Sequence, residues 1–179
     1  MHEKKKLEEA KYFYSKMIEE QRHRDYFTYN LSAFLSTARS VLQYALPEAK
    51  TKSGGLQWYN NYITTICILR FFKDKRDINI HTEPIQLQSH AKLEFSETLH
   101  LSDSISITHT DEDGNIKQQY SSNKPEQLLK EPQAPAVMQI KYKFNDWVNN
   151  DDVLTLCQLY IQELEILIKD GVKKGFITG

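Results

Sequence analysis

Residues 55–81, GLQWYNNYITTICILRFFKDKRDINIH, decide how this chain folds. Apolar side chains recur in the stretch at helical spacing: Trp58, Tyr62, Ile63, Ile66, Leu69 and Phe71 or Phe72. This spacing predicts one helix, from Gly55 to about Asn79, that buries a broad face. Directly after Phe72 the sequence becomes charged, so we expect the last turn to leave the core. Thr82-Glu83-Pro84 should end the helix, because proline lacks the backbone N–H.

Three further segments have the same helical spacing of apolar residues. They are residues 3–22, residues 25–46, and a final helix that begins after Asn149-Asn150-Asp151-Asp152 and ends near Gly171. Asp25 is expected to cap the second helix and Pro47 to end it. Arg39 lies toward the polar side of that helix, where it faces either the site or solvent, and we favour solvent.

After Pro84 the apolar period changes to the alternation that is typical of strands. Strands are expected near residues 93–101, 105–107, 116–120 and 137–144, in one antiparallel sheet of three or four strands. Asp111-Glu112-Asp113-Gly114-Asn115 predicts a hairpin turn, with Gly114 at positive φ. A calcium loop is disfavoured there, because the later bidentate glutamate is missing. Residues 121–136 are rich in proline and polar residues and predict a surface loop.

Composition and charge describe a soluble globular protein. Apolar residues make up 40% of the 179 residues and charged residues 26%, which is enough to bury a core. The net charge is −1, yet residues 1–81 have 14 Lys and Arg against 9 Asp and Glu. A phosphate-bearing partner is therefore more plausible for the N-terminal half than for the rest.

The sequence predicts no cofactor, no metal and no membrane segment. Cys67 and Cys157 fit no metal spacing, and we expect two buried thiols in a reducing compartment. The N-terminus lacks the apolar run of a signal peptide, and no apolar stretch is long enough to span a bilayer. We therefore expect a cytoplasmic protein.

Together these patterns predict a mainly α fold. Four amphipathic helices bury their apolar stripes by packing as an up-down bundle, with a small antiparallel β-sheet inserted between the third and last long helices. The expected bundle covers residues 1–85 and 144–179, and the β-rich insertion with its proline-rich loop covers residues 86–143.

Arg76 and His81 form the pair of residues that most suggests chemistry. The run Arg76-Asp77-Ile78-Asn79-Ile80-His81 resembles the R-x(4–6)-H motif of the HEPN superfamily. The polar residue that this family favours directly after the arginine is Asp77 here. The segment from Phe144-Asn145-Asp146-Trp147 to Leu167 also looks like the closing helix of small bacterial members. The resemblance spans about residues 1–85 and 144–175.

This resemblance implies metal-independent RNA cleavage by a homodimer in which two motifs face one cleft. A guanidinium binds phosphate through a fork of donors, and an imidazole titrates near neutral pH and can transfer a proton. Arg76 would then stabilise phosphate charge and His81 would be the general acid and base. Asp77 or Asn79 would orient the pair. Toxin or defence members of this kind also imply a protein partner of the antitoxin type.

The spacing sets a geometric condition on this site. Five residues turn an ideal helix about 140° away from the starting face, so Arg76 and His81 converge only where the helix ends or loosens. β-branched Ile78 and Ile80 favour such loosening. Failing that, a dimer interface could bring the two side chains together.

Two other readings remain open. In the structural one, Arg76 and Asp77 form a solvated ion pair, while His81 lies at the helix C-terminus, where a cation is favoured. In the functional one, the chain is a non-catalytic HEPN-like module that binds RNA, a nucleotide or a protein partner, and the β insertion is its recognition surface.

Overall fold

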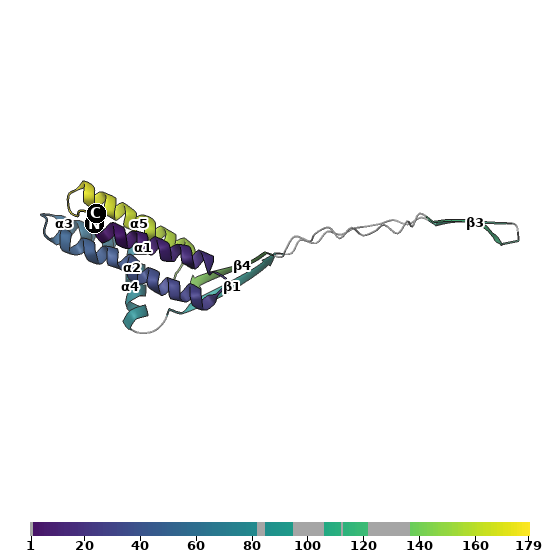
Figure 1. Cartoon of the computed structure of the whole chain (residues 1–179), viewed down its shortest axis with the longest axis horizontal. Coiled ribbons are helices and arrows are strands. Elements are labelled where there is room, and N and C mark those ends of the chain that lie inside the picture. The colour runs from purple at the N-terminus through teal and green to yellow at the C-terminus, as the bar shows by residue number, and fades with distance from the viewer. Residues whose placement is uncertain (1, 82–84, 95–105, 112, 122–136) are drawn as a thin grey trace. The chain divides into compact units, whose positions relative to one another are not determined.

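The structure is a computed structural model that describes residues 2–81, 85–94, 106–111, 113–121 and 137–179. The chain forms two units, one of residues 1–91 with 140–179 and one of residues 92–139. The first unit is mainly helical, which confirms the coarse fold class (Figure 1). The expected helix stop at Thr82-Glu83-Pro84 and the expected loop at 122–136 lie outside the described residues.

Five helices are present in the described part of the chain, where the sequence predicts four. They are α1 (His2–Glu19), α2 (Arg24–Lys50), α3 (Gly55–Thr65), α4 (Cys67–His81) and α5 (Val153–Lys173). α2 is the central helix, because it contacts each of the other four. Its buried residues recur at helical spacing along its whole length, as the sequence predicts: Phe27, Leu31, Phe34, Leu35, Ala38, Val41, Leu42, Ala45 and Ala49.

The predicted ends of α2 are wrong at both termini. The N-cap residue is His23, without a side-chain cap, and Asp25 lies in the first turn instead, where a negative charge is favoured by the helix dipole. Pro47 lies inside the helix, which continues to Lys50. The buried side chain of Ala49 gives this last turn apolar contact beyond the proline, so packing outweighs the hydrogen bond that proline cannot make.

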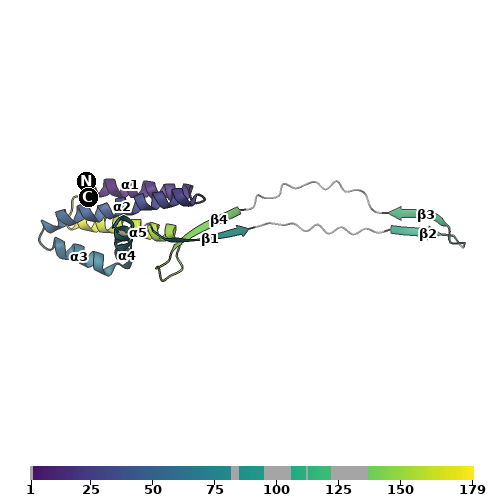
Figure 2. The same cartoon turned by 90° about the horizontal axis from the view of Figure 1, so that it is seen from below.

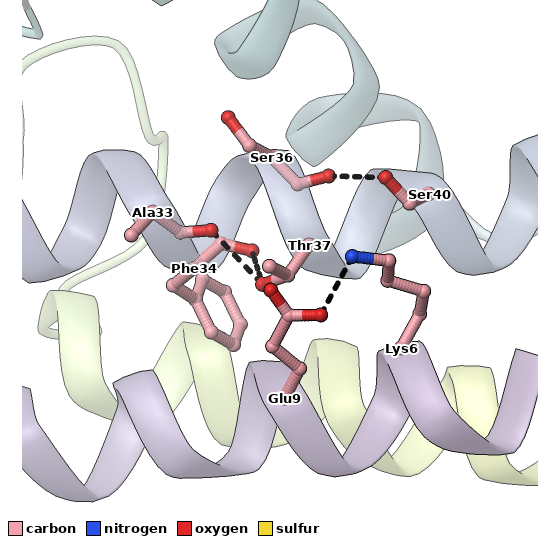
Figure 3. Close-up of polar contacts among 7 residues, drawn as sticks. All are labelled: Lys6, Glu9, Ala33, Phe34, Ser36, Thr37 and Ser40. Carbon is pink, nitrogen blue, oxygen red and sulfur yellow. Dashed lines mark hydrogen bonds and ion pairs between the residues drawn. The ribbon is translucent and has the colours of Figure 1, made fainter.

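Hydroxyl side chains on α2 bond to the backbone of their own helix (Figure 3). Thr37 Oγ1 donates to the carbonyls of Ala33 and Phe34 at 2.9 and 3.0 Å, and Ser40 Oγ donates to Ser36 O at 2.8 Å. Figure 3 shows Thr37 on the side of α2 toward α1, and Ser36 and Ser40 on the opposite side. These hydroxyls are small, so neighbouring helices approach α2 closely while its polar groups stay bonded.

The single helix predicted from Gly55 to Asn79 is two helices. Ile66 between them has φ −92° and ψ 107°, an extended conformation that ends α3 after Thr65. The run Ile63-Thr64-Thr65-Ile66 is β-branched throughout, which lowers its helix propensity. Thr64 Oγ1 also bonds the carbonyl of Asn60 at 2.8 Å. The break lets α4 take a direction of its own.

α5 begins as predicted and ends later. The Asp152 side chain accepts a hydrogen bond from the Thr155 N–H at 2.8 Å, so Asp152 is the N-cap. Gly171 does not end the helix, which continues to Lys173. A Cβ on Gly171 would lie 2.6 Å from the Trp58 ring and 2.9 Å from Ile177, so glycine is needed there for close packing. The terminal segment folds back, and Ile177 is buried.

The strands form two separate pairs and not the single sheet that the sequence predicts. β1 (Leu87–Glu94) pairs with β4 (Val137–Phe144), and β2 (Ser106–Thr110) pairs with β3 (Ile116–Ser121) (Figure 2). β2 and β3 are antiparallel, with Ile107 opposite Tyr120 and an irregularity between His109 and Thr110. The predicted hairpin turn is confirmed, and Gly114 has φ 84°. Most of the expected 93–101 strand lies outside the described residues.

Three aromatic rings from three helices form the centre of the core. The rings of Phe72 (α4) and Tyr160 (α5) stack in parallel with centroids 4.6 Å apart. Phe34 (α2) meets each of them edge-on at 6.2 Å. All three side chains are fully buried. Of the two cysteines, Cys157 is buried as predicted, but Cys67 is exposed, because the break at Ile66 places it at the start of α4.

Truncation of the central ring should remove much of the stability. We expect Phe72→Ala to lower the free energy of unfolding by about 3–5 kcal/mol, since it leaves a cavity between three helices. Urea denaturation followed by circular dichroism measures this change. Leu159→Ala, at an exposed position of α5, is the control and should cost far less. Equal costs for the two variants would contradict the central role of Phe72.

A carboxylate joins α3 to α5 and makes stability depend on pH. Hydrogen bonds from Lys174 and from Trp58 Nε1, the latter at 2.7 Å, lower the pKa of Asp170. Because the folded pKa lies below the unfolded value, the ionised group adds stability above pH about 4 and loses it as the pH falls further.

We therefore expect Asp170→Asn to be less stable than the wild type at pH 7, with the difference shrinking as the pH falls below about 4. Urea midpoints measured across this pH range test it. Asp113→Asn, at an exposed position of the turn between β2 and β3, is the control. A difference between Asp170→Asn and wild type that is constant with pH would show that the carboxylate charge plays no part.

Candidate functional site

Two adjacent phenylalanines fix the position of α4. Successive helical residues point about 100° apart, so Phe71 and Phe72 contact different neighbours. Phe72 enters the three-ring core, while Phe71 packs edge-on against Phe144 and Trp147, with centroids 5.3 and 4.7 Å away. Since the helix is held on two sides here, the turn that follows, with Arg76, has a defined direction.

Lys75 strengthens the same contact with the segment after β4. Its Nζ lies 2.5 Å from Asp146 Oδ1 and over the rings of Phe71 and Phe144, at 5.4 and 5.3 Å from their centroids. Only 9% of this residue is exposed. The sequence predicts that the charged last turn, which includes Lys75, leaves the core. For Lys75 this prediction is wrong. Its methylene chain covers the aromatic rings and its charge is neutralised by Asp146.

Arg76 is held between its neighbour and the protein interior. Its Nη1 donates to Asp77 Oδ1 at 3.0 Å, and 22% of its side chain is exposed. Its Nε is buried and has no hydrogen-bond partner. The exposed fraction leaves room for a phosphate oxygen, which would share the guanidinium with the Asp77 carboxylate. The Asp77 carboxylate therefore contacts Arg76 directly and would compete with any anionic ligand for it.

Asn79 ties the last turns of α4 to the central helix. Its Nδ2 donates to Ser32 Oγ of α2 at 2.7 Å. Asn79 lies three residues beyond Arg76, so the two positions share one side of α4. The hydrogen bond fixes this side against α2 and keeps Arg76 near the surface where the two helices meet.

The helix continues to His81, whose side chain lies outside the described part of the structure. The loosening expected from Ile78 and Ile80 is absent, because α4 is helical from Cys67 to His81. On a continuous helix the two motif positions are about 140° apart around the axis. The backbone therefore places Arg76 and His81 on different sides of α4.

Arg39 is half-buried and faces the interior, in contrast to the solvent position that the sequence favours. Its Nε is buried without a hydrogen-bond partner. Burial raises the pKa of Tyr59 and of Tyr160, and the positive charge of Arg39 acts against that rise in both. Arg39 therefore lies close to α3 and α5. Since both tyrosines stay neutral at physiological pH, they offer Arg39 no negative charge.

Sequence reasoning missed one hollow on the helical unit. A cavity of about 350 Å³ is lined by Lys16, Glu20, Tyr26, Tyr29 and Asn30. Helical periodicity puts these residues on the polar sides of α1 and α2, which gives no sign that they meet. The available signal was the unusual presence of Tyr26 and Tyr29 on a polar face.

Comparison of the chain with models of protein families, with curated proteins and with solved structures found no match. In the described part of the chain, no group of three His, Cys, Asp or Glu residues is placed to hold a metal ion. None of the helices there combines the length and the apolar character that crossing a bilayer requires. The resemblance to HEPN proteins therefore remains a hypothesis, which rests on Arg76, Asp77, Asn79 and His81.

The Ser32–Asn79 hydrogen bond should be measurable by a double-mutant cycle. We expect Ser32→Ala and Asn79→Ala to show a coupling energy of about 0.5–1.5 kcal/mol, because each removes the same bond. Urea denaturation of both single variants and the double variant gives this value. Ser40→Ala combined with Asn79→Ala is the control and should be additive. A coupling near zero for Ser32 and Asn79 would show that the bond does not hold α4.

Proposed function

We propose that this chain is a HEPN-like, metal-independent endoribonuclease that acts as a homodimer on RNA. Arg76 supports the proposal most directly. It is a partly exposed guanidinium with an unpartnered Nε, on a helix fixed by the aromatic core and by the Asn79–Ser32 bond. A cation held in this way can bind a phosphate without first losing the conformational entropy of a free side chain.

The proposed reaction needs only these side chains and the RNA. The ribose 2′-hydroxyl attacks the adjacent phosphorus, and the bond to the 5′-oxygen of the next nucleotide breaks. His81 takes the proton of the attacking hydroxyl and returns it to the leaving 5′-oxygen, since an imidazole titrates near neutral pH. The products are a 2′,3′-cyclic phosphate and a 5′-hydroxyl. Arg76 stabilises the charge that develops on the phosphate oxygens. Asp77 and Asn79 position Arg76.

The continuous helix determines how such a site is assembled. Positions 76 and 81 lie about 140° apart on one α4, so a productive pair combines Arg76 of one chain with His81 of a second. A two-fold dimer provides this pairing twice, because each chain gives its arginine to one site and its histidine to the other.

RNA cleavage by the pure protein in the presence of EDTA tests the activity. We expect cleavage to persist in EDTA and to fall roughly 10²–10⁴-fold in His81→Ala, as for loss of a general acid–base group. Arg76→Ala should be similarly impaired. His109→Ala, an exposed histidine on β2, is the matched control and should cleave normally. Equal cleavage by wild type and His81→Ala would end the proposal.

Mixing the two inactive variants tests the shared site. In a 1:1 mixture of Arg76→Ala and His81→Ala, half of the dimers are mixed and each contains one intact site, so about a quarter of wild-type activity should return. No recovery, despite exchange of subunits, would place both groups of the site in one chain.

A second candidate is a non-catalytic HEPN-like module that binds RNA, a nucleotide or a protein partner of the antitoxin type. The β2–β3 hairpin favours it, because Ile107 and Tyr120 are cross-strand partners and are 54% and 79% exposed. Exposed apolar pairs of this kind are typical of binding surfaces. If the protein binds RNA through Arg76 but cleaves none of it, the chain is a binding module and not an enzyme.

A further inference from the structure

The cavity between α1 and α2 has the chemistry of a small binding site. It is a depression of about 350 Å³ that is wide open to solvent, so it can cover one face of a ligand but does not enclose it. Lys16 comes from the last turn of α1, Glu20 from the turn that follows this helix, and Tyr26, Tyr29 and Asn30 from the first turns of α2. The two helices are joined by a short turn, which keeps these five side chains together.

The two tyrosines of the cavity expose their rings. Tyr26 is 56% exposed and Tyr29 66%, with ring centroids 6.4 Å apart. His23 extends the group, with its ring 5.8 Å from Tyr26. The Asn30 amide donates to the Tyr26 carbonyl at 2.8 Å, which fixes one edge of the cavity. Exposed aromatic rings in such a cluster are available to stack on a planar ligand.

The lining combines flat aromatic faces with polar groups of several kinds. A planar ring with hydrogen-bonding edges can stack on a tyrosine and bond to the Glu20 carboxylate or the Asn30 amide. Lys16 is the one cation among the five lining residues, and its Nζ pairs with Glu19 at 2.5 Å. An unpaired nucleobase is such a planar ring with hydrogen-bonding edges.

The cavity also lies beside the proposed RNA site. Residues three apart on a helix are surface neighbours, so Tyr29 lies next to Ser32 on α2. Ser32 accepts the hydrogen bond from Asn79 of α4, which is one turn beyond Arg76. A polynucleotide strand that leaves Arg76 can therefore cross the outer face of α2 and reach Tyr29 without leaving the helical unit.

We infer that the cavity lined by Lys16, Glu20, Tyr26, Tyr29 and Asn30 stacks an unpaired base of single-stranded RNA. This inference rests on the proposed function, because the base belongs to the strand whose phosphate Arg76 binds. The cavity thus adds preference for single strands, since the bases of a duplex have no free face to stack.

Binding of 2′-O-methyl oligouridine tests the inference, because this strand lacks the attacking hydroxyl and stays intact. We expect Tyr29→Ala to weaken its binding roughly 5- to 150-fold, the usual range for loss of one stacked base, while Tyr29→Phe retains it. An abasic oligonucleotide of equal length should bind wild type and Tyr29→Ala equally. Tyr44→Ala, an exposed tyrosine farther along α2, is the matched control and should bind normally.

Three results would overturn the inference: unchanged binding by both Tyr26→Ala and Tyr29→Ala, equal weakening for the intact and abasic strands, or conversion of a dimer to a monomer by Tyr29→Ala in sedimentation. The last would assign the surface to a second copy. Arg76→Ala should weaken the binding of the intact and the abasic strand equally. Unchanged binding by Arg76→Ala would overturn the proposed function but not the stacking of a base in the cavity. If neither strand binds the wild type, titration with adenosine tests the cavity directly. Adenosine that leaves the tyrosine fluorescence unquenched would show that the cavity does not stack a base.

Discussion

The parallel stacking of Phe72 on Tyr160 is the contact on which the arrangement of the helical unit depends. It joins the short α4 to the long α5, and the edge of Phe34 joins both to the central α2. α4 has only 15 residues and would not be stable as an isolated helix. Its position therefore comes from these rings and from Phe71 on its other side. The positions of Arg76, Asp77 and Asn79, which belong to α4, follow from that placement.

The same placement explains why the polar residues of α4 have such different surroundings. Lys75 follows the Phe71 side and becomes buried over aromatic rings, whereas Arg76 and Asn79 follow the side toward α2. Arg76 and Arg39 both keep a buried Nε without a partner, which is costly in a protein interior. Such a cost is typically tolerated near functional surfaces. For Arg76, 22% of the side chain is exposed, so its outer end remains accessible.

The sequence was sufficient where a local rule decides the outcome and failed where packing does. The Asp152 cap and the Gly114 turn depend on a few neighbouring residues, and both were predictable. Pro47 remains inside α2 because Ala49 beyond it is buried, and the sequence does not show that contact. The break at Ile66 had a signal in its β-branched run. For the candidate site, the motif residues can be read from the sequence, but the Asn79–Ser32 bond and the tyrosine cavity depend on which helices meet.

The pairing of β1 with β4 has a consequence for how this chain can change in evolution. The polypeptide leaves the helical unit along β1 and returns along β4, which pairs with β1. Residues 92–139 are therefore an insertion whose two ends lie side by side. The entropic cost of closing such an insertion grows only slowly with its length. Segments of other sizes and sequences can therefore be grafted at this position, and relatives that share the helical unit are expected to differ most between these two strands.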